Sequence, residues 1–166
     1  VPVKLPNGAI VHALCAHPTP PAFDGEEKRN ARRNHDEIRF WADYVDRKLW
    51  IVDDQGATCG VRWDRPFVIL GDLNADPDEG SSFKDPIGTI LASVDRINLT
   101  PVPTGTPIDG LDDDDTASWG LRVDYVLPST DLQVRRSGVW RDVPGQGPFP
   151  SDHFPVWMDL LVPDPG

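Results

Sequence analysis

The stretch FVILGDLNADPDEG, residues 67–80, constrains the fold more than any other part of the sequence. A short continuous apolar run over residues 66–72 is typical of a strand covered on both faces, so the chain must supply a layer on each side of a sheet. The run ends abruptly in Asp72 and Asn74. Polar groups beside a buried strand cost free energy unless they are paired. Taken alone, a turn capped by Asp72 explains them as well as a functional role does.

The remaining apolar segments predict a layered α/β domain. Strands are expected where apolar, β-branched and aromatic residues gather, at 9–17, 121–129, 132–140 and 153–162. Residues 85–94 favour a short helix, 53–56 a turn, and 100–118 a long loop without periodicity. No internal repeat or linker is visible, so we expect one domain over residues 1–166, with strands interleaved among few helices.

The strongest helix signal covers residues 26–49. Ile38, Trp41, Val45 and Leu49 recur at spacings of three and four, which gives one apolar face. Asp24 is a suitable cap for the first turn. The predicted helix therefore packs one face against the sheet.

Polar residues stand at the ends of four predicted strands. They are His17, the pair Asp72 and Asn74, Asp124, and the pair Asp152 and His153. Each has a structural explanation: Asp124 could pair with Arg122 or Arg96, Asp152 could belong to a turn, and a lone histidine is more often packed than catalytic. Together they fit phosphoester hydrolysis, which needs an activated water, neutralisation of the phosphoryl charge and stabilisation of the leaving group.

Three motifs in this order resemble the endonuclease/exonuclease/phosphatase superfamily: GDLNADP, RVDYVLPS and SDHFPVW, after a strand that ends in histidine. The resemblance covers about residues 10–161. It implies an α/β fold of the deoxyribonuclease-I type, in which mixed sheets form a four-layer sandwich with helices packed outside. It also implies a metal-dependent phosphoester hydrolase, either a phosphodiesterase or nuclease or a phosphatase.

The resemblance assigns roles to the first motif. Asp72 is similar to the family residue that orients or deprotonates the attacking water. Asn74 is similar to the amide that holds a phosphoryl oxygen or the metal. The active site of such folds lies at strand ends, so the resemblance explains why this strand ends in polar residues.

The other motifs supply the remaining groups. By resemblance, Asp124 orients His17, and His17 acts as general acid or binds phosphate. His153 resembles the second catalytic histidine, and its neighbour Asp152 can reach the metal. The expected ion is Mg²⁺, with Mn²⁺ or Ca²⁺ as alternatives.

The sequence departs from the family pattern in its first part. The family places an asparagine and a metal-binding glutamate before the histidine strand, and no room for them precedes residue 9. We therefore expect the C-terminal half of a domain, with weak metal binding and poor catalysis in isolation. Half of a two-sheet sandwich leaves an apolar face uncovered, so we expect a homodimer or pairing with the missing N-terminal half.

The net charge of the chain restricts the classes of substrate that it is expected to bind. Sixteen basic against 27 acidic residues give a net charge of −11, which argues against tight binding to duplex DNA. Small or lipid-like phosphoesters, or weakly bound nucleic acid, remain open. On the predicted helix Arg33, or its neighbour Arg32, is a candidate phosphate ligand, although a solvated helix face is the simpler explanation.

Other functions stay open at this point. The alternative to an enzyme is a non-catalytic scaffold or binding module with the same fold. The acidic run 112–115 is expected to be a solvated surface, with a calcium site as a minor alternative. A disulfide between Cys15 and Cys59 is left open, and a buried thiol is favoured for Cys15. No apolar stretch approaches membrane-spanning length.

Overall fold

The computed structural model describes residues 1–142 and 149–164. Its main sheet contains β1 (Pro2–Lys4), β2 (Ile10–Cys15), β3 (Phe67–Asp72) and β4 (Asp124–Pro128), in the order β1-β2-β3-β4. Only the β2–β3 pair is parallel. A second, antiparallel sheet is formed by β5 (Gln133–Val139) and β6 (Val156–Leu161).

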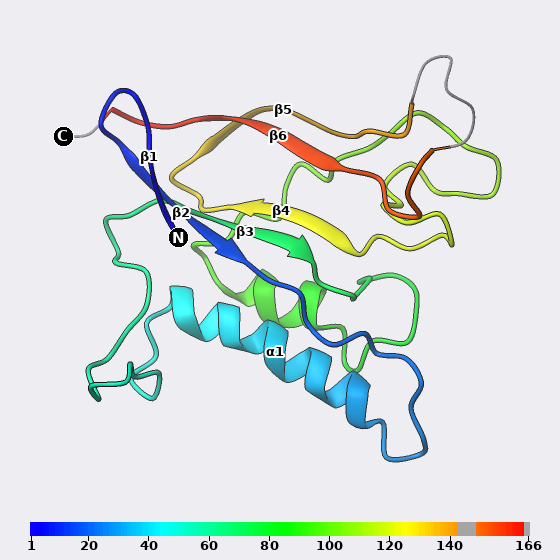
Figure 1. Cartoon of the computed structure of the whole chain (residues 1–166), viewed down its shortest axis with the longest axis horizontal. Coiled ribbons are helices and arrows are strands. Elements are labelled where there is room, and N and C mark those ends of the chain that lie inside the picture. Colours follow the sequence, from blue (N-terminus) through cyan, green and yellow to red (C-terminus); the bar gives the residue numbers. More distant parts are fainter. Residues whose placement is uncertain (143–148, 165–166) are drawn as a thin grey trace.

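These elements form three layers (Figure 1). Helix α1 (Arg29–Val45) and a short helical segment cover one side of the main sheet, and the ribbon of β5 and β6 lies on the other side. The short segment consists of a π-helical turn, η1 (Pro86–Ile90), and a 3₁₀ turn, η2 (Leu91–Ser93). The mixed α/β class expected from the sequence is confirmed, and so is the helix expected near residues 85–94.

Strand β3 is the centre of the core, as its apolar run predicts. Phe67 and Ile69 are fully buried, and they belong to a cluster that includes Ile38 and Val45 of α1 and Leu127 of β4. Alternate residues of a strand point to opposite faces, and the intervening Val68 is also buried. Layers on both sides of the sheet therefore exclude water from β3.

Helix α1 is shorter than the predicted 26–49. Asp24 does cap it in effect, because its two carboxylate oxygens accept the N–H groups of Asn30 at 2.7 Å and Ala31 at 2.8 Å. The helix ends at Val45, and Leu49 lies beyond it with 82% of its surface exposed. The apolar spacing continued past the physical end of the helix, so the placement of Leu49 on the packed face was wrong.

The loop expected at 100–118 is present, but the acidic run inside it is not wholly solvated. Asp115 is only 5% exposed, and its carboxylate accepts the N–H of Asp112 at 2.7 Å. The guanidinium of Arg141 donates to the backbone carbonyls of Asp112 and Asp115, at 2.6 and 2.5 Å. The run is therefore a folded turn around a buried arginine.

Both cysteines are free, and Cys15 is exposed, contrary to the buried thiol expected for it. No helix within the described ranges is long and apolar enough to cross a membrane. On β6, Trp157 and Leu161 are 42% and 49% exposed. Among the described residues, no helix or strand lies outside the β5–β6 ribbon (Figure 1).

Candidate active site

The site begins where β3 ends. Asp72 lies opposite Asp124 in the antiparallel β3–β4 pair, so strand register alone brings two carboxylates together. After β3 the chain turns at Asn74, which adopts a left-handed conformation with φ of 51°. The backbone N–H of Asn74 donates to Oδ1 of Asp72 at 2.8 Å, and its side chain donates to the carbonyl of Pro18 at 3.1 Å. The turn thus connects the ends of β2 and β3.

Asp124 holds His153. Nδ1 of His153 lies 2.8 Å from Oδ2 of Asp124, within hydrogen-bonding distance. His153 is placed by a backbone bridge to Ala117, in the long loop before β4. The expectation that Asp124 orients His17 was wrong, because Asp124 bonds to the other histidine.

His17 faces Asp72 instead. It lies two residues beyond β2, and its Nε2 is 3.5 Å from Oδ2 of Asp72. Its side chain is 75% exposed, against 19% for that of Asp72. The close approach of β2 to β3 requires Gly71, where an added Cβ would stand 2.0 Å from the carbonyl oxygen of Ala16. The five residues His17, Asp72, Asn74, Asp124 and His153 therefore form one connected group.

Two pKa shifts follow from this geometry. Partial burial raises the pKa of Asp72, the N–H of Asn74 opposes this, and the charge of Asp124 adds to it. For His153, partial burial lowers the pKa, but the hydrogen bond and charge of Asp124 outweigh it, with help from Asp72 and Asp152. The net result is a pKa of His153 above its ordinary value. The site therefore favours a protonated imidazole beside crowded carboxylates.

The same residues could hold a cation. Asp72, Asp124 and His153 each offer one ligand atom, and these three atoms lie within 4.8 Å of one another. Two carboxylates in proximity repel each other, and a hard divalent cation with oxygen ligands relieves that repulsion. The two carboxylates therefore fit a divalent metal, and His153 can join them only with its imidazole neutral. Asp152, expected to reach the metal, is exposed and lies outside this group.

Arg33 does not join the group directly. Its side chain is 66% exposed, and its Nε donates to Glu37 at 2.9 Å along α1. Glu37 in turn accepts the backbone N–H of Thr19 at 2.6 Å, two residues after His17. Arg33 thus contacts the loop after His17 through Glu37, and its role as a phosphate ligand stays a prediction.

Two residues of the site were not identified from the sequence. Thr116, which is 2% exposed, accepts the N–H groups of Val123 and Asp124 with its hydroxyl, each at 2.9 Å. Trp119 is half exposed and lies edge-on to His153, with 5.0 Å between ring centroids. Both belong to a loop without periodicity, and periodicity was the signal used to find structure.

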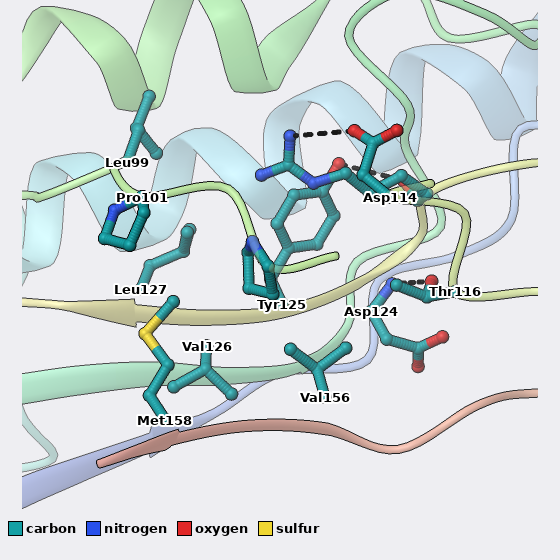
Figure 2. Close-up of a pocket in the computed structure, with 12 residues that line it drawn as sticks. Leu99, Pro101, Asp114, Thr116, Asp124, Tyr125, Val126, Leu127, Val156 and Met158 are labelled. Atoms are coloured by element: carbon teal, nitrogen blue, oxygen red, sulfur yellow. Dashed lines mark hydrogen bonds and ion pairs between the residues drawn. The ribbon is translucent and has the colours of Figure 1, made fainter. Parts of the chain in front are cut away.

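Thr116 and Asp124 stand together at one end of a narrow pocket between β4 and β6 (Figure 2). The other end is lined by apolar side chains, including Leu99, Pro101 and Met158. The carboxylate of Asp124 therefore lies between the apolar interior of this pocket and the other four residues of the connected group. At this position the hydroxyl of Thr116 accepts two backbone N–H groups at the start of β4.

Several solved structures share the fold. An endonuclease/exonuclease/phosphatase from Beutenbergia cavernae is 22% identical, with a TM-score of 0.61. A functionally unknown conserved protein from Enterococcus faecalis is 15% identical, with a TM-score of 0.55, and sphingomyelinase C from Streptomyces griseocarneus is 17% identical, with a TM-score of 0.52. At these identities the likeness concerns the fold alone.

The matches cover nearly all of this chain but only part of each neighbour. They span 97%, 93% and 90% of the chain, and 38%, 50% and 52% of the three neighbours. The chain therefore corresponds to about half the length, or less, of these proteins. No curated protein matches it.

The sequence itself matches a family model over residues 4–153, a range that holds all five residues of the connected group. That range includes the strand-end histidine, the first two motifs from which the resemblance was inferred and the first three residues of the third, Ser151 to His153. The chain belongs to the endonuclease/exonuclease/phosphatase family.

Proposed function

We propose that this chain carries the catalytic residues of a metal-dependent phosphoester hydrolase. One observation carries the proposal: ligand atoms of Asp72, Asp124 and His153 lie within 4.8 Å of one another at strand ends, with Asp124 hydrogen-bonded to His153. Membership of a family of phosphoester hydrolases supports it. Phosphoryl transfer depends mostly on positioning and electrostatics, which a preformed polar group on rigid strands supplies.

The side chains divide the reaction among them. Asp72 accepts a proton from the attacking water, whose oxygen forms the new bond to phosphorus while the bond to the leaving oxygen breaks. The hydrogen bond with Asp124 engages Nδ1 of His153, which leaves Nε2 to donate to a phosphoryl oxygen. His17, the more exposed histidine, protonates the leaving oxygen. Asn74 offers its amide to the phosphoryl group.

A divalent cation supplies charge neutralisation on the phosphoryl oxygens when it is bound. Asp72 and Asp124 would hold it, and Asn74 and Asp152 are further candidates from the sequence. Mg²⁺ is the proposed ion, with Mn²⁺ or Ca²⁺ as alternatives. We expect the 166-residue chain alone to bind it weakly, because the carboxylates of Asp72 and Asp124 would supply few of the oxygen ligands that such an ion takes.

The proposed substrate is a small or lipid-like phosphoester. A net charge of −11 disfavours a tight complex with duplex DNA, whose affinity depends on many basic contacts. Arg33 and His17 are the side chains proposed to meet the substrate. Nucleic acid bound weakly is the competing substrate, and salt dependence separates them: a nucleic-acid substrate gives a steep loss of binding with salt.

We further propose that the outer side of the β5–β6 ribbon packs against more polypeptide, either a second copy or the N-terminal half of a larger domain. Trp157 and Leu161 are its exposed apolar side chains. The partial coverage of the structural neighbours supports the second choice. Light scattering of the 166-residue chain tests whether a second copy packs there. If the chain is a monomer at high concentration, and Trp157→Ser does not change its measured mass, the homodimer is excluded.

The test of function uses two generic substrates, p-nitrophenyl phosphate and its bis ester, with Mg²⁺ and with EDTA. It is performed on this chain and on a longer chain that contains it. Asp72→Asn and His153→Gln should each abolish turnover in the longer chain, whereas the exposed Asp109→Asn should not change it. If the longer chain hydrolyses neither ester and Asp72→Asn does not change Mn²⁺ affinity, the fold serves as a scaffold.

A further inference from the structure

The apolar face of α1 contains one amide. Ala31, Ile38, Ala42 and Val45 are its buried apolar residues, and Asn34, on the same face, has no exposed surface at all. A polar side chain at such a position costs free energy unless it is hydrogen-bonded. Asn34 therefore needs an explanation that helix packing alone does not give.

The hydrogen bonds of Asn34 go to a single place. Its Nδ2 donates to the backbone carbonyl of Leu73 at 2.9 Å and to that of Asn74 at 3.3 Å. Its own carbonyl oxygen, Oδ1, has no hydrogen-bond partner among the described residues, although it is buried. An unsatisfied buried acceptor is unfavourable. The favourable contribution of the Asn34 side chain therefore comes from its donor group, which is hydrogen-bonded to the turn after β3.

That turn is the one that sets the catalytic carboxylate. Asn74 adopts a left-handed conformation, and its N–H binds Oδ1 of Asp72. Non-glycine residues visit this conformation infrequently, although asparagine tolerates it better than most, so further hydrogen bonds to the turn stabilise it. Asn34 anchors the carbonyls of two consecutive residues, Leu73 and Asn74, and thereby limits rotation of the peptide unit between them.

We propose that Asn34 is a positioning residue of this site. It fixes the turn at Asn74 from the helix layer, and through that turn it holds the carboxylate of Asp72 in place. This inference deepens the proposed function and rests on it for its catalytic meaning. Asn34 is fully buried and touches no substrate, so its effect reaches the reacting atoms only through Asn74 and Asp72.

The experiment measures hydrogen exchange of the Asn74 backbone amide by NMR, in the 166-residue chain without metal or substrate. Asn34→Leu removes the donor at nearly constant volume. Ile38→Val is the matched control, because it weakens packing on the same helix face without touching the turn. Asn34→Leu should accelerate exchange at Asn74 at least tenfold more than at the amides of β3 and β4. Ile38→Val should change all of these amides together.

A second readout uses Mn²⁺ as the probe, in the longer chain. Loss of a residue that orients a ligand typically weakens metal binding about 10–100-fold, so we expect a weakening in this range for Asn34→Leu and none for Ile38→Val. If Asn34→Leu does not fold, Asn34→Ser takes its place with the same expectation.

Three results would overturn the inference. The first is an Asn74 exchange rate that follows the strand amides in both variants. The second is an equal loss of Mn²⁺ affinity in the two variants. The third is failure of both Asn34 variants to fold while Ile38→Val folds, which would make Asn34 a folding residue. Absence of phosphoester hydrolysis in the wild type would refute the proposed function, but the exchange measurement would still decide the role of Asn34.

Discussion

Thr116→Val tests how the fold fixes the catalytic dyad. The hydroxyl oxygen of Thr116 accepts the N–H groups of Val123 and Asp124, each at 2.9 Å. Valine has nearly the same shape but no acceptor, so both donors at the start of β4 lose their partner. Because Asp124 holds His153, the same change should loosen the dyad.

The magnitude follows from the burial of the two donors. Val123 is 3% exposed, so its N–H finds no replacement from water, and an unsatisfied buried donor costs about 1–3 kcal/mol. The N–H of Asp124 is only partly buried and loses less. We expect a total loss of about 2–4 kcal/mol, which is a large part of the about 5–15 kcal/mol typical of a domain.

Urea unfolding followed by tryptophan fluorescence measures this loss. With a slope of about 2 kcal/mol per molar urea, the midpoint should fall by about 1–2 M. Thr116→Ser keeps the hydroxyl and should lose less than half as much. Equal midpoints for the valine and serine variants would refute the reasoning, because loss of the hydroxyl acceptor would then cost no more than loss of the methyl group.

Three further predictions concern the pH dependence, the strand approach and the core. The pKa of His153 is raised in the folded state. Its pair with Asp124 therefore stabilises the fold fully below about pH 6.5. This contribution to the free energy of unfolding disappears as the pH rises through the folded pKa. His153→Gln should flatten urea midpoints measured across that range; a slope equal to that of the wild type would contradict this. Gly71→Ala should destabilise by more than about 2 kcal/mol in thermal unfolding, because φ is 135° and the added Cβ would stand 2.0 Å from a backbone oxygen; an unchanged midpoint would show that β2 can move away. Phe67→Ala should cost about 3–5 kcal/mol because Phe67 is fully buried, whereas Leu49→Ser should stay within about 0.5 kcal/mol because Leu49 is 82% exposed; similar losses for the two would contradict the packing described here.

Local patterns determined much of the fold. The apolar run before Asp72 predicted β3, since a strand that is buried on both faces consists mainly of apolar residues. The spacing of Ile38 and Val45 predicted α1 and its packed face. The pattern failed at Leu49, because periodicity does not report where the hydrogen-bonded helix ends.

The site was predicted as a set of residues, and the structure changed how they are paired. The sequence marked His17, Asp72, Asn74, Asp124 and His153 as candidates, because polar residues at strand ends are conspicuous. It led to the wrong partner for Asp124, which binds His153. A sequence motif within one strand does not predict how that strand is aligned with its neighbour. This alignment, the register, places Asp72 opposite Asp124.

The sequence by itself therefore determined most of the strands and helices, though not the short strand β1, and which family the motifs belong to, because both depend on neighbours along the chain. Tertiary structure alone decided the pairings and the supports, such as Thr116 beneath Asp124 and Asn34 behind Asn74. The physical reason is that a hydrogen bond between residues distant in sequence depends on how the layers pack, and the sequence of one segment does not predict that packing.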